Sequence, residues 1–295
     1  TVGVIQDARD PAPVTPPIQA PAAKKNMYTP VALEFCCGSA RISKSLSVLG
    51  FRTVGVDFHF NQSRPESFCI SIDLSSQEGQ ALAWKWVAHP ATAFVWWAPP
   101  CGTASRAREK QGYPQPLRDD DHPEGLPDIR GQDQVRVEKA NRIYEFCAEV
   151  CAYCQARGIF YVVENPRRSL MWETVWFRTL FSEHAPTIID YHACMHGGQR
   201  RKAQRLYTNL DALRSLAVQC DESHSHLPWV VVAQGRRYYM TSQETQYPYV
   251  FCERVARVVA GQVLVNAHTP AANKVLELKA KLSTLRRLNA AAAGR

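Results

Sequence analysis

The 295-residue sequence contains no signal peptide and no apolar run long enough to cross a lipid bilayer. We therefore expect neither secretion nor insertion into a membrane. The ten cysteines also lack the spacing of a disulfide framework: Cys147, Cys151 and Cys154 recur at i, i+4, i+7, which is typical of one packed helix face. Cysteines of this kind predict an intracellular protein in a reducing compartment.

An initiating methionine is also missing, because the sequence begins at Thr1. Residues 1–28 are rich in proline and alanine, a composition typical of a disordered arm or an interdomain linker. Together these features favour a processed product or a piece of a longer polypeptide, such as the polyprotein of a mobile element.

The charge is unbalanced towards the positive side, with a formal net charge of +8 and a pI of about 9.0. This favours an anionic partner such as nucleic acid, although an ordinary basic protein is the alternative. Apolar residues make up 45% of the chain, which is enough to bury a sizeable core.

Strand-like and helix-like stretches alternate along the chain from residue 31 onward. This alternation predicts an α/β fold with a parallel sheet that is covered by helices on both faces. The predicted strands cover residues 31–35, 52–58, 67–74, 92–100, 159–165 and 187–194, with a basic turn at 196–209. The predicted helices cover residues 41–50, 78–90, 132–157 and 249–267.

Only one glycine, Gly38, follows the first predicted strand, so the three-glycine dinucleotide motif is absent. A strand–glycine turn–helix unit still lets the backbone approach a ligand closely. Acidic residues end the next two strands, where Asp57 is suited to bind ribose hydroxyls and Asp73 to accept from an adenine amino group. Turn-forming or helix-capping aspartates are the alternative for both positions.

A cysteine follows two prolines at the end of the fourth predicted strand. Prolines end strands, so Cys101 is expected on a loop at the carboxyl edge of the sheet, where open α/β sheets bind ligands. Glu164 and Asn165 end the fifth strand, which brings Glu164 and Cys101 to one cleft if the strands are neighbours. A thiolate beside a carboxylic acid suits addition to an electron-poor ring. A packed cysteine and a helix-capping glutamate are the alternatives.

The order of the segments EFCCGSA, VDF, APPC, VENP and RRKAQRLYTN resembles the cytosine-5 DNA methyltransferase family over about residues 33–256. The resemblance implies a Rossmann-like S-adenosylmethionine-dependent methyltransferase sheet with a small C-terminal recognition subdomain. It also implies methyl transfer to carbon 5 of cytosine in DNA, and a nuclear location if the chain is eukaryotic. The corresponding divisions are a catalytic domain at 29–209, a recognition region at 210–245, a returning helix at 246–267 and a peripheral helical tail at 268–295.

The resemblance also implies roles for the residues at the matching positions. Cys101 attacks carbon 6 of cytosine, Glu164 contacts ring nitrogen 3 and Asn165 orders the Pro-Cys loop. The target base must leave the duplex stack to be reached. The implied cofactor-binding residues are Phe35, Gly38, Ser39, Asp57, Asp73 and Pro99.

Basic residues complete the implied site. Arg205 is assigned to the catalytic set from the arginine-rich segment, and the nucleic acid, most simply duplex DNA, is assigned to Arg106, Arg108, Arg200, Arg201 and Lys202. A solvated basic edge is the alternative. The chain departs from the family pattern at Pro166, in the GTASRAR stretch after Cys101, and in the absence of a Gly-Asn-Ser-Val-x-Pro motif.

Three other functions are compatible with these motifs. One is a non-catalytic methyltransferase-like module that binds nucleic acid, and another is an RNA cytosine methyltransferase. The third is an amino-methyltransferase, although Ala98 stands where those enzymes have a polar residue and Cys101 where they have an aromatic one.

A separate group of possible metal ligands is the Cys-x3-His-x-His run of Cys220, His224 and His226. Cys194 or Cys252 is the candidate for a fourth ligand, since structural zinc takes four nitrogen and sulfur ligands. A poorly patterned region benefits from such a staple. A surface histidine pair in a loop is the alternative.

Overall fold

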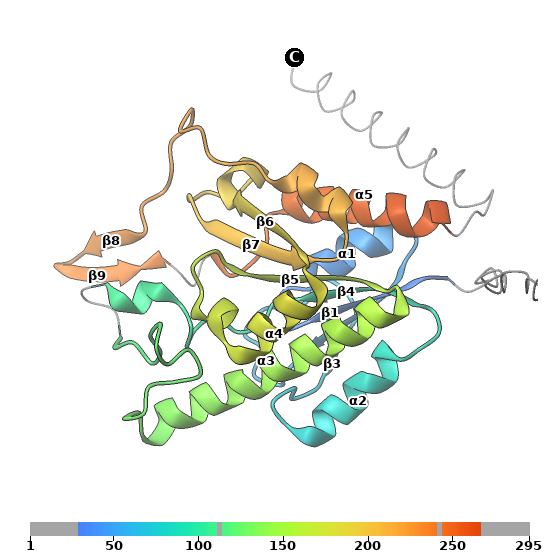
Figure 1. The fold of residues 1–295 in the computed structure, drawn as a ribbon. Helices are drawn as coiled ribbons and strands as arrows, with labels where there is room; N and C mark the ends of the chain where they lie inside the picture. Colours follow the sequence, from blue (N-terminus) through green and yellow to red (C-terminus); the bar gives the residue numbers. More distant parts are fainter. Residues whose placement is uncertain (1–28, 111–113, 241–243, 267–295) are drawn as a thin grey trace, which may run out of the picture.

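The computed structural model describes residues 29–110, 114–240 and 244–266, and its centre is one seven-stranded sheet (Figure 1). The strand order is β3-β2-β1-β4-β5-β7-β6. The strands are β1 (Val31–Phe35), β2 (Arg52–Asp57), β3 (Cys69–Ser71), β4 (Thr92–Trp97), β5 (Phe160–Pro166), β6 (Thr187–His192) and β7 (Ala203–Thr208). The predicted arm (1–28) and tail (268–295) lie outside the described residues.

The sheet is parallel from β1 to β5, but β7 runs antiparallel to both of its neighbours. The prediction of a wholly parallel sheet is therefore wrong at this edge. The cause is the short connection between β6 and β7, since a parallel return needs a crossover of about a dozen residues or more. Residues predicted as a basic turn form β7 instead.

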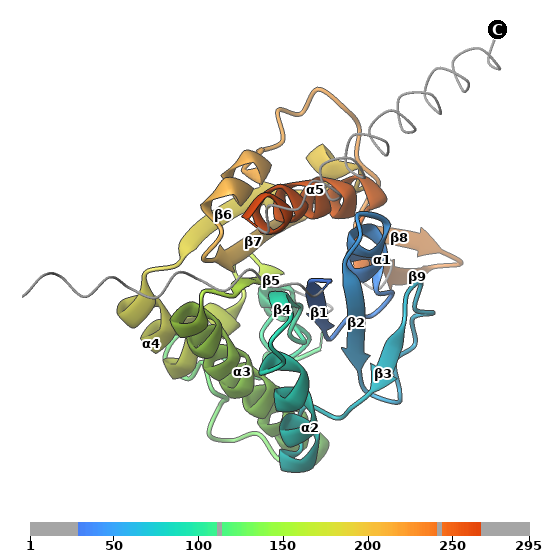
Figure 2. The same cartoon turned by 90° about the vertical axis from the view of Figure 1, so that its right-hand side faces the viewer.

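Within the described residues, five α-helices cover the sheet on both faces, as predicted, and Figure 2 shows the two layers. Residues that alternate along β1 point into different cores, with Ala32 on one side and Leu33 on the other. One core is closed by α1 (Arg41–Val48) and α5 (Tyr249–Asn266), and the other by α2 (Gln77–Val87), α3 (Gly131–Arg157) and α4 (Val175–His184).

The strand order identifies the fold class. Six parallel strands, with the antiparallel β7 inserted between β5 and β6, form the Rossmann-like sheet of S-adenosylmethionine-dependent methyltransferases. In such a sheet the ligand site lies outside the carboxyl ends of the central strands. No helix among the described residues is both long and apolar enough to cross a membrane.

The region predicted as a recognition subdomain (210–245) contains a short 3-10 helix and a hairpin. The 3-10 helix Asp211–Leu216 buries Leu213 and Leu216 in the same core as α5. The hairpin of β8 (Val230–Ala233) and β9 (Arg236–Tyr239) is largely exposed and projects from the body (Figure 1). This region therefore adds to the main core and carries one protruding hairpin.

Candidate active site

Three neighbouring strands end at one edge of the sheet. Phe35 of β1 pairs with Trp97 of β4, which in turn pairs with Val163 of β5. The glycine turn after β1, the Pro-Pro-Cys loop after β4 and the Glu-Asn pair at the end of β5 therefore lie side by side. This is the edge at which the sequence predicts a site.

The glycine turn is held by the acidic end of β2. The Gly38 amide donates to Asp57 Oδ2 at 2.7 Å, and the Phe58 amide donates to Oδ1 at 2.8 Å. Gly38 has a φ of +51°, a left-handed conformation that favours glycine. Burial raises the pKa of Asp57, although these two amides lower it. Each carboxylate oxygen keeps a lone pair for a further donor, such as a ribose hydroxyl.

Two other predicted cofactor residues have structural roles at this edge. The Asp73 carboxylate accepts from the Ser75 amide at 2.9 Å and from its hydroxyl at 2.6 Å, so the turn-forming alternative is present there. Burial opposes ionisation of Asp73, but the bonds from Ser75 outweigh it and the pKa is lowered. The Phe35 ring is fully buried and stacks on Trp97 with ring centroids 4.3 Å apart. Phe35 therefore lies beneath the edge.

Ser39 is buried, and its carbonyl accepts from the Glu66 amide at 2.8 Å. The sequence analysis missed Phe58, which directly follows Asp57 and is 46% exposed. Large aromatic side chains are normally packed, so an exposed ring beside the half-buried Asp57 carboxylate offers a stacking surface for a planar ligand. The sequence signal for this residue was the phenylalanine that ends the VDF segment.

Two hydrogen bonds order the loop that carries Cys101. The Asn165 side-chain amide donates to the Pro99 carbonyl at 2.8 Å, and the Tyr144 hydroxyl donates to the Pro100 carbonyl at 2.5 Å. Asn165 comes from the end of β5 and Tyr144 from α3, so two elements hold two successive carbonyls. The Cys101 backbone is thereby tied to both neighbours of the loop.

A buried arginine holds the segment after Cys101. Arg118 is 1% exposed and donates to Thr103 Oγ1 at 3.1 Å, to the Pro123 carbonyl at 2.6 Å and to Asn141 Oδ1 at 2.7 Å. It connects the long loop before α3 with a residue only two positions beyond Cys101. Nothing in the sequence pattern distinguished this arginine from its exposed neighbours.

The side chains of Cys101 and Glu164 share one electrostatic environment. Burial raises the pKa of Cys101; the nearby Lys202 ammonium lowers it, and the Glu164 carboxylate raises it. Burial also raises the pKa of Glu164, which Lys202 again opposes. One cation therefore lies near both groups, and the Glu164 carboxylate disfavours the Cys101 thiolate.

Glu164 is held by two residues that the sequence analysis did not single out. Gln204 donates its side-chain amide to Oε1, and the Tyr247 hydroxyl donates to Oε2 at 2.5 Å. Glu164 pairs with Leu206 across the antiparallel ladder, so the alternation of β7 puts Gln204 on the same face. Tyr247 lies in the segment that takes the place of the absent Gly-Asn-Ser-Val-x-Pro motif.

Arg205 lies on the other face of the sheet from Glu164. It pairs in register with Asn165 and forms a two-pronged ion pair with Asp190, at 2.7 Å and 2.9 Å. The sequence analysis predicts Arg205 in the catalytic set. In the structure it instead borders a basic cavity of about 250 Å³, together with Arg106, Arg167, Arg168, Ser169 and Glu173.

The other predicted nucleic-acid-binding residues differ in their surroundings. Arg106 borders the basic cavity and pairs with Glu109 and Asp120. Arg108 donates to the Gln115 carbonyl at 2.9 Å. In the segment before β7, burial differs from residue to residue.

Arg200 is 3% exposed and bonds Glu244 at 2.8 Å, so its guanidinium faces the protein interior. The sequence predicts Arg200 as a nucleic-acid-binding residue, and that role stays a prediction. Arg201 is exposed and pairs with Glu222. Lys202 is half-buried and donates to the Glu244 carbonyl at 2.9 Å, beside the site described above.

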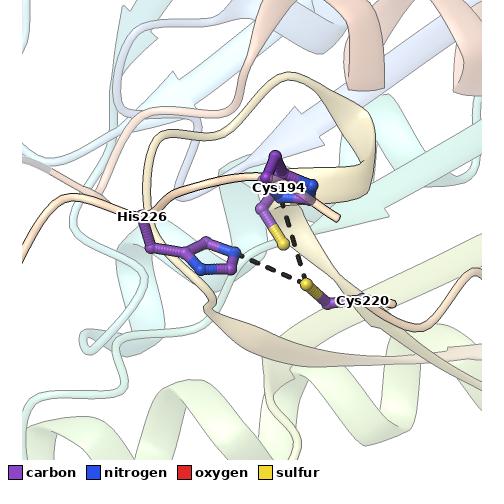
Figure 3. A group of neighbouring side chains, drawn as sticks. Cys194, Cys220 and His226 are labelled. Carbon is purple, nitrogen blue, oxygen red and sulfur yellow. Dashed lines mark hydrogen bonds between the residues drawn. The ribbon is translucent and has the colours of Figure 1, made fainter. Parts of the chain in front are cut away.

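The three predicted metal ligands, Cys220, His224 and His226, lie together with Cys194, which is one of the two candidates for the fourth ligand. Ligand atoms of Cys194, Cys220, His224 and His226 all lie within 4.8 Å of one another, and Figure 3 shows three of these side chains. Cys252 is fully buried in the core around α5 and is not part of the cluster.

No family model matches the chain, and no curated protein matches it. Among solved structures, a mutant of Spodoptera frugiperda DNMT2 matches 61% of this chain and 49% of its own, at 13% identity and a TM-score of 0.36. The Entamoeba histolytica methyltransferase EhMeth matches 62% of this chain and 53% of its own, at 12% identity and a TM-score of 0.33. The chain spans about half the length of each. The strand order identifies the methyltransferase-like fold independently of these matches.

Proposed function

We propose that this protein transfers a methyl group from S-adenosylmethionine to carbon 5 of cytosine in DNA through a covalent adduct with Cys101. The observation that carries the proposal is the hydrogen bond from Asn165 to the Pro99 carbonyl. It joins the end of β5 to the loop that presents the cysteine, at the ligand-binding edge of a methyltransferase-like sheet. The neighbouring Glu164 then lies next to the same loop.

The chain offers a cofactor cradle at the same edge. The Gly38 turn lets the backbone approach S-adenosylmethionine closely. The Asp57 carboxylate can bind its ribose, and the exposed Phe58 ring can stack on its adenine. When bound, this cofactor supplies an electrophilic methyl group on a sulfonium. These residues fit S-adenosylmethionine although the three-glycine loop is absent, because Asp57 holds the single glycine turn through its hydrogen bond with the Gly38 amide.

The chemistry of the target ring follows from the two titratable groups. The Cys101 thiolate forms a bond to carbon 6, and the electron pair of the C5–C6 bond makes carbon 5 nucleophilic. Glu164, whose raised pKa favours the protonated form, donates a hydrogen bond to ring nitrogen 3. After carbon 5 is methylated, loss of its proton to a base expels the thiolate and restores the ring.

Lys202 and Gln204 complete the proposed ring site. The Lys202 charge opposes the burial that keeps Cys101 protonated. The Gln204 Oε1 atom is buried and has no hydrogen-bond partner among the described residues. Buried acceptors are normally satisfied, so this oxygen is suited to receive the exocyclic amine of a cytosine.

The basic cavity supports a polyanionic substrate. Arg167 and Arg168 are exposed directly after the Glu-Asn pair, and Arg106 follows Cys101 by five positions. The backbone links these two segments, since the Leu170 amide donates to the Ala104 carbonyl at 2.9 Å. Cationic side chains beside a base-binding pocket are suited to hold phosphates of the flanking nucleotides.

The test is nucleoside mass spectrometry after incubation of the full chain with S-adenosylmethionine and duplex DNA, with tRNA as a parallel arm. We expect 5-methylcytosine in DNA from the wild type and from Cys151→Ala, a control at a packed cysteine of α3. We expect none from Cys101→Ala. Product on an exocyclic amine, or product that persists in Cys101→Ala, contradicts the cysteine mechanism. Product in tRNA alone replaces DNA with RNA as the substrate.

A further inference from the structure

Four soft metal ligands from two separate segments converge beside the end of β6. Cys194 lies in the 3-10 helix Ala193–His196 that follows β6, whereas Cys220, His224 and His226 belong to a later loop. All four ligand atoms lie within 4.8 Å of one another. Two segments that are separated in the sequence therefore supply ligands to one cluster.

The distances suit zinc. Ligands around tetrahedral zinc, at about 2.3 Å for sulfur and about 2.0 Å for nitrogen, stand roughly 3.3–3.8 Å apart. The Cys220 sulfur lies 3.4 Å from His226 Nε2 and 4.0 Å from His224 Nε2. Figure 3 shows the side chains of Cys194, Cys220 and His226 converging on one point. Because no two ligand atoms are more than 4.8 Å apart, a contraction of at most about 1.5 Å closes a Cys2His2 set.

The backbone around Cys220 is arranged for a sulfur that carries negative charge. The Glu222 amide points at the Cys220 sulfur at 3.4 Å, and Glu222 adopts a left-handed φ of +62° to do so. The Cys220 amide in turn donates to His192 Nδ1 at 2.8 Å, the last residue of β6. Amides that donate to a ligand sulfur stabilise a metal-bound thiolate, as outer-sphere partners commonly do.

The same loop is connected to the site around Cys101. We define residues 220–228 as the strap. Its Leu227 amide donates to the Gln199 carbonyl at 3.0 Å, and its Pro228 carbonyl accepts from Arg200 at 3.0 Å. Arg200 and Lys202 both bond Glu244. Any group that fixes the position of the strap therefore also helps to fix the position of the segment that carries Lys202.

We propose that Cys194, Cys220, His224 and His226 bind one structural Zn²⁺, which fastens the strap to the end of β6. Four protein ligands close the coordination shell and leave no position for a substrate. The ion therefore acts on stability and on the placement of the strap. The proposal is independent of which reaction the site around Cys101 performs.

The first test is the zinc content of the purified full chain by elemental mass spectrometry, after equilibration with zinc chloride and removal of free metal. We expect about one zinc per chain in the wild type and in Cys252→Ser, the matched control at the other candidate cysteine. We expect a several-fold lower content in Cys194→Ser. Equal zinc in Cys194→Ser and the wild type, or loss in Cys252→Ser instead, overturns the assignment.

A second measurement covers the case in which Cys194→Ser fails to fold. Cobalt chloride added to metal-stripped wild-type protein is expected to produce the intense visible bands of tetrahedral coordination and a thiolate-to-cobalt charge-transfer band. Stoichiometric zinc chloride should abolish both bands. Absence of these bands, or a Cys194–Cys220 disulfide found by mass spectrometry in protein purified with reductant, overturns the proposal.

Discussion

The side-chain amide of Asn165 donates a hydrogen bond of 2.8 Å to the carbonyl oxygen of Pro99. Both residues are buried, so water does not compete for this bond. The bond joins two strand ends that are separated by a long loop and the longest helix of the described chain. Through it, a residue that does not touch the proposed target ring controls the position of the residue that attacks it.

Asn165→Ala is expected to lower kcat by roughly 10- to 100-fold, because a lost buried hydrogen bond costs about 1–3 kcal/mol. The affinity for S-adenosylmethionine should change little. The measurements are steady-state methylation kinetics and calorimetric cofactor binding. Asn61→Ala is the control, because Asn61 bonds the Gly38 carbonyl at 2.8 Å and should weaken cofactor binding instead. Equal effects of both variants on cofactor affinity contradict the positioning role of Asn165.

Lys202→Met is expected to slow alkylation of Cys101 by iodoacetamide at neutral pH by roughly three- to tenfold. The Lys202 charge lowers the pKa of the Cys101 thiol against the effect of burial, so its removal reduces the thiolate fraction. The rate should recover at higher pH. Peptide mass spectrometry across a pH series measures this at Cys101 alone. Lys202→Arg keeps the charge and should resemble the wild type; a slow rate in both variants argues for a steric cause.

Arg168→Ala is expected to weaken binding to duplex DNA about equally for unrelated sequences. A contact to phosphate carries no sequence information, and its loss reduces the dependence of log K on log salt by about one unit. Fluorescence anisotropy at several salt concentrations tests this. Arg257→Ala, at an exposed arginine of α5 that pairs with Glu253, is the control. An unchanged salt slope in Arg168→Ala removes this residue from the interface.

Glu34→Gln is expected to remove a pH dependence of the free energy of unfolding. Glu34 is buried in β1, and burial raises its pKa to about 7 although the Ser43 amide donates to it at 2.6 Å. The folded protein therefore holds a proton that the unfolded chain releases above about pH 4.3. Stability should be highest below that pH and decline towards pH 7, by on the order of 3 kcal/mol.

Denaturant unfolding of the wild type and Glu34→Gln at a series of pH values between 4 and 8 measures this decline. The difference between the two proteins should grow in favour of the variant as the pH rises. A constant difference across the series means that Glu34 does not titrate in this window. Glu149→Gln, at a less buried glutamate of α3, serves as the control.

The local sequence pattern was sufficient to predict the strands and helices that alternate regularly along the chain. The strands that became β1, β2 and β4 lie within one to three residues of their predicted ends, and the long helix begins one residue before its predicted start. The placement of Cys101 and Glu164 at one edge followed from parallel strands that end in proline and polar residues. The direction of β7 did not follow, because it depends on the length of a connection that the sequence presents only as a basic turn.

The sequence by itself determined the order of the strands and helices up to β6, and the residue types at the ends of these strands, because apolar periodicity and proline act locally. Only the tertiary structure decided which side chains share a face. Arg205 points away from Glu164 while Gln204 meets it, because the antiparallel register of β7 assigns alternate residues to opposite faces. Likewise Cys194, and not Cys252, joins the histidines, because α5 buries Cys252 in the core.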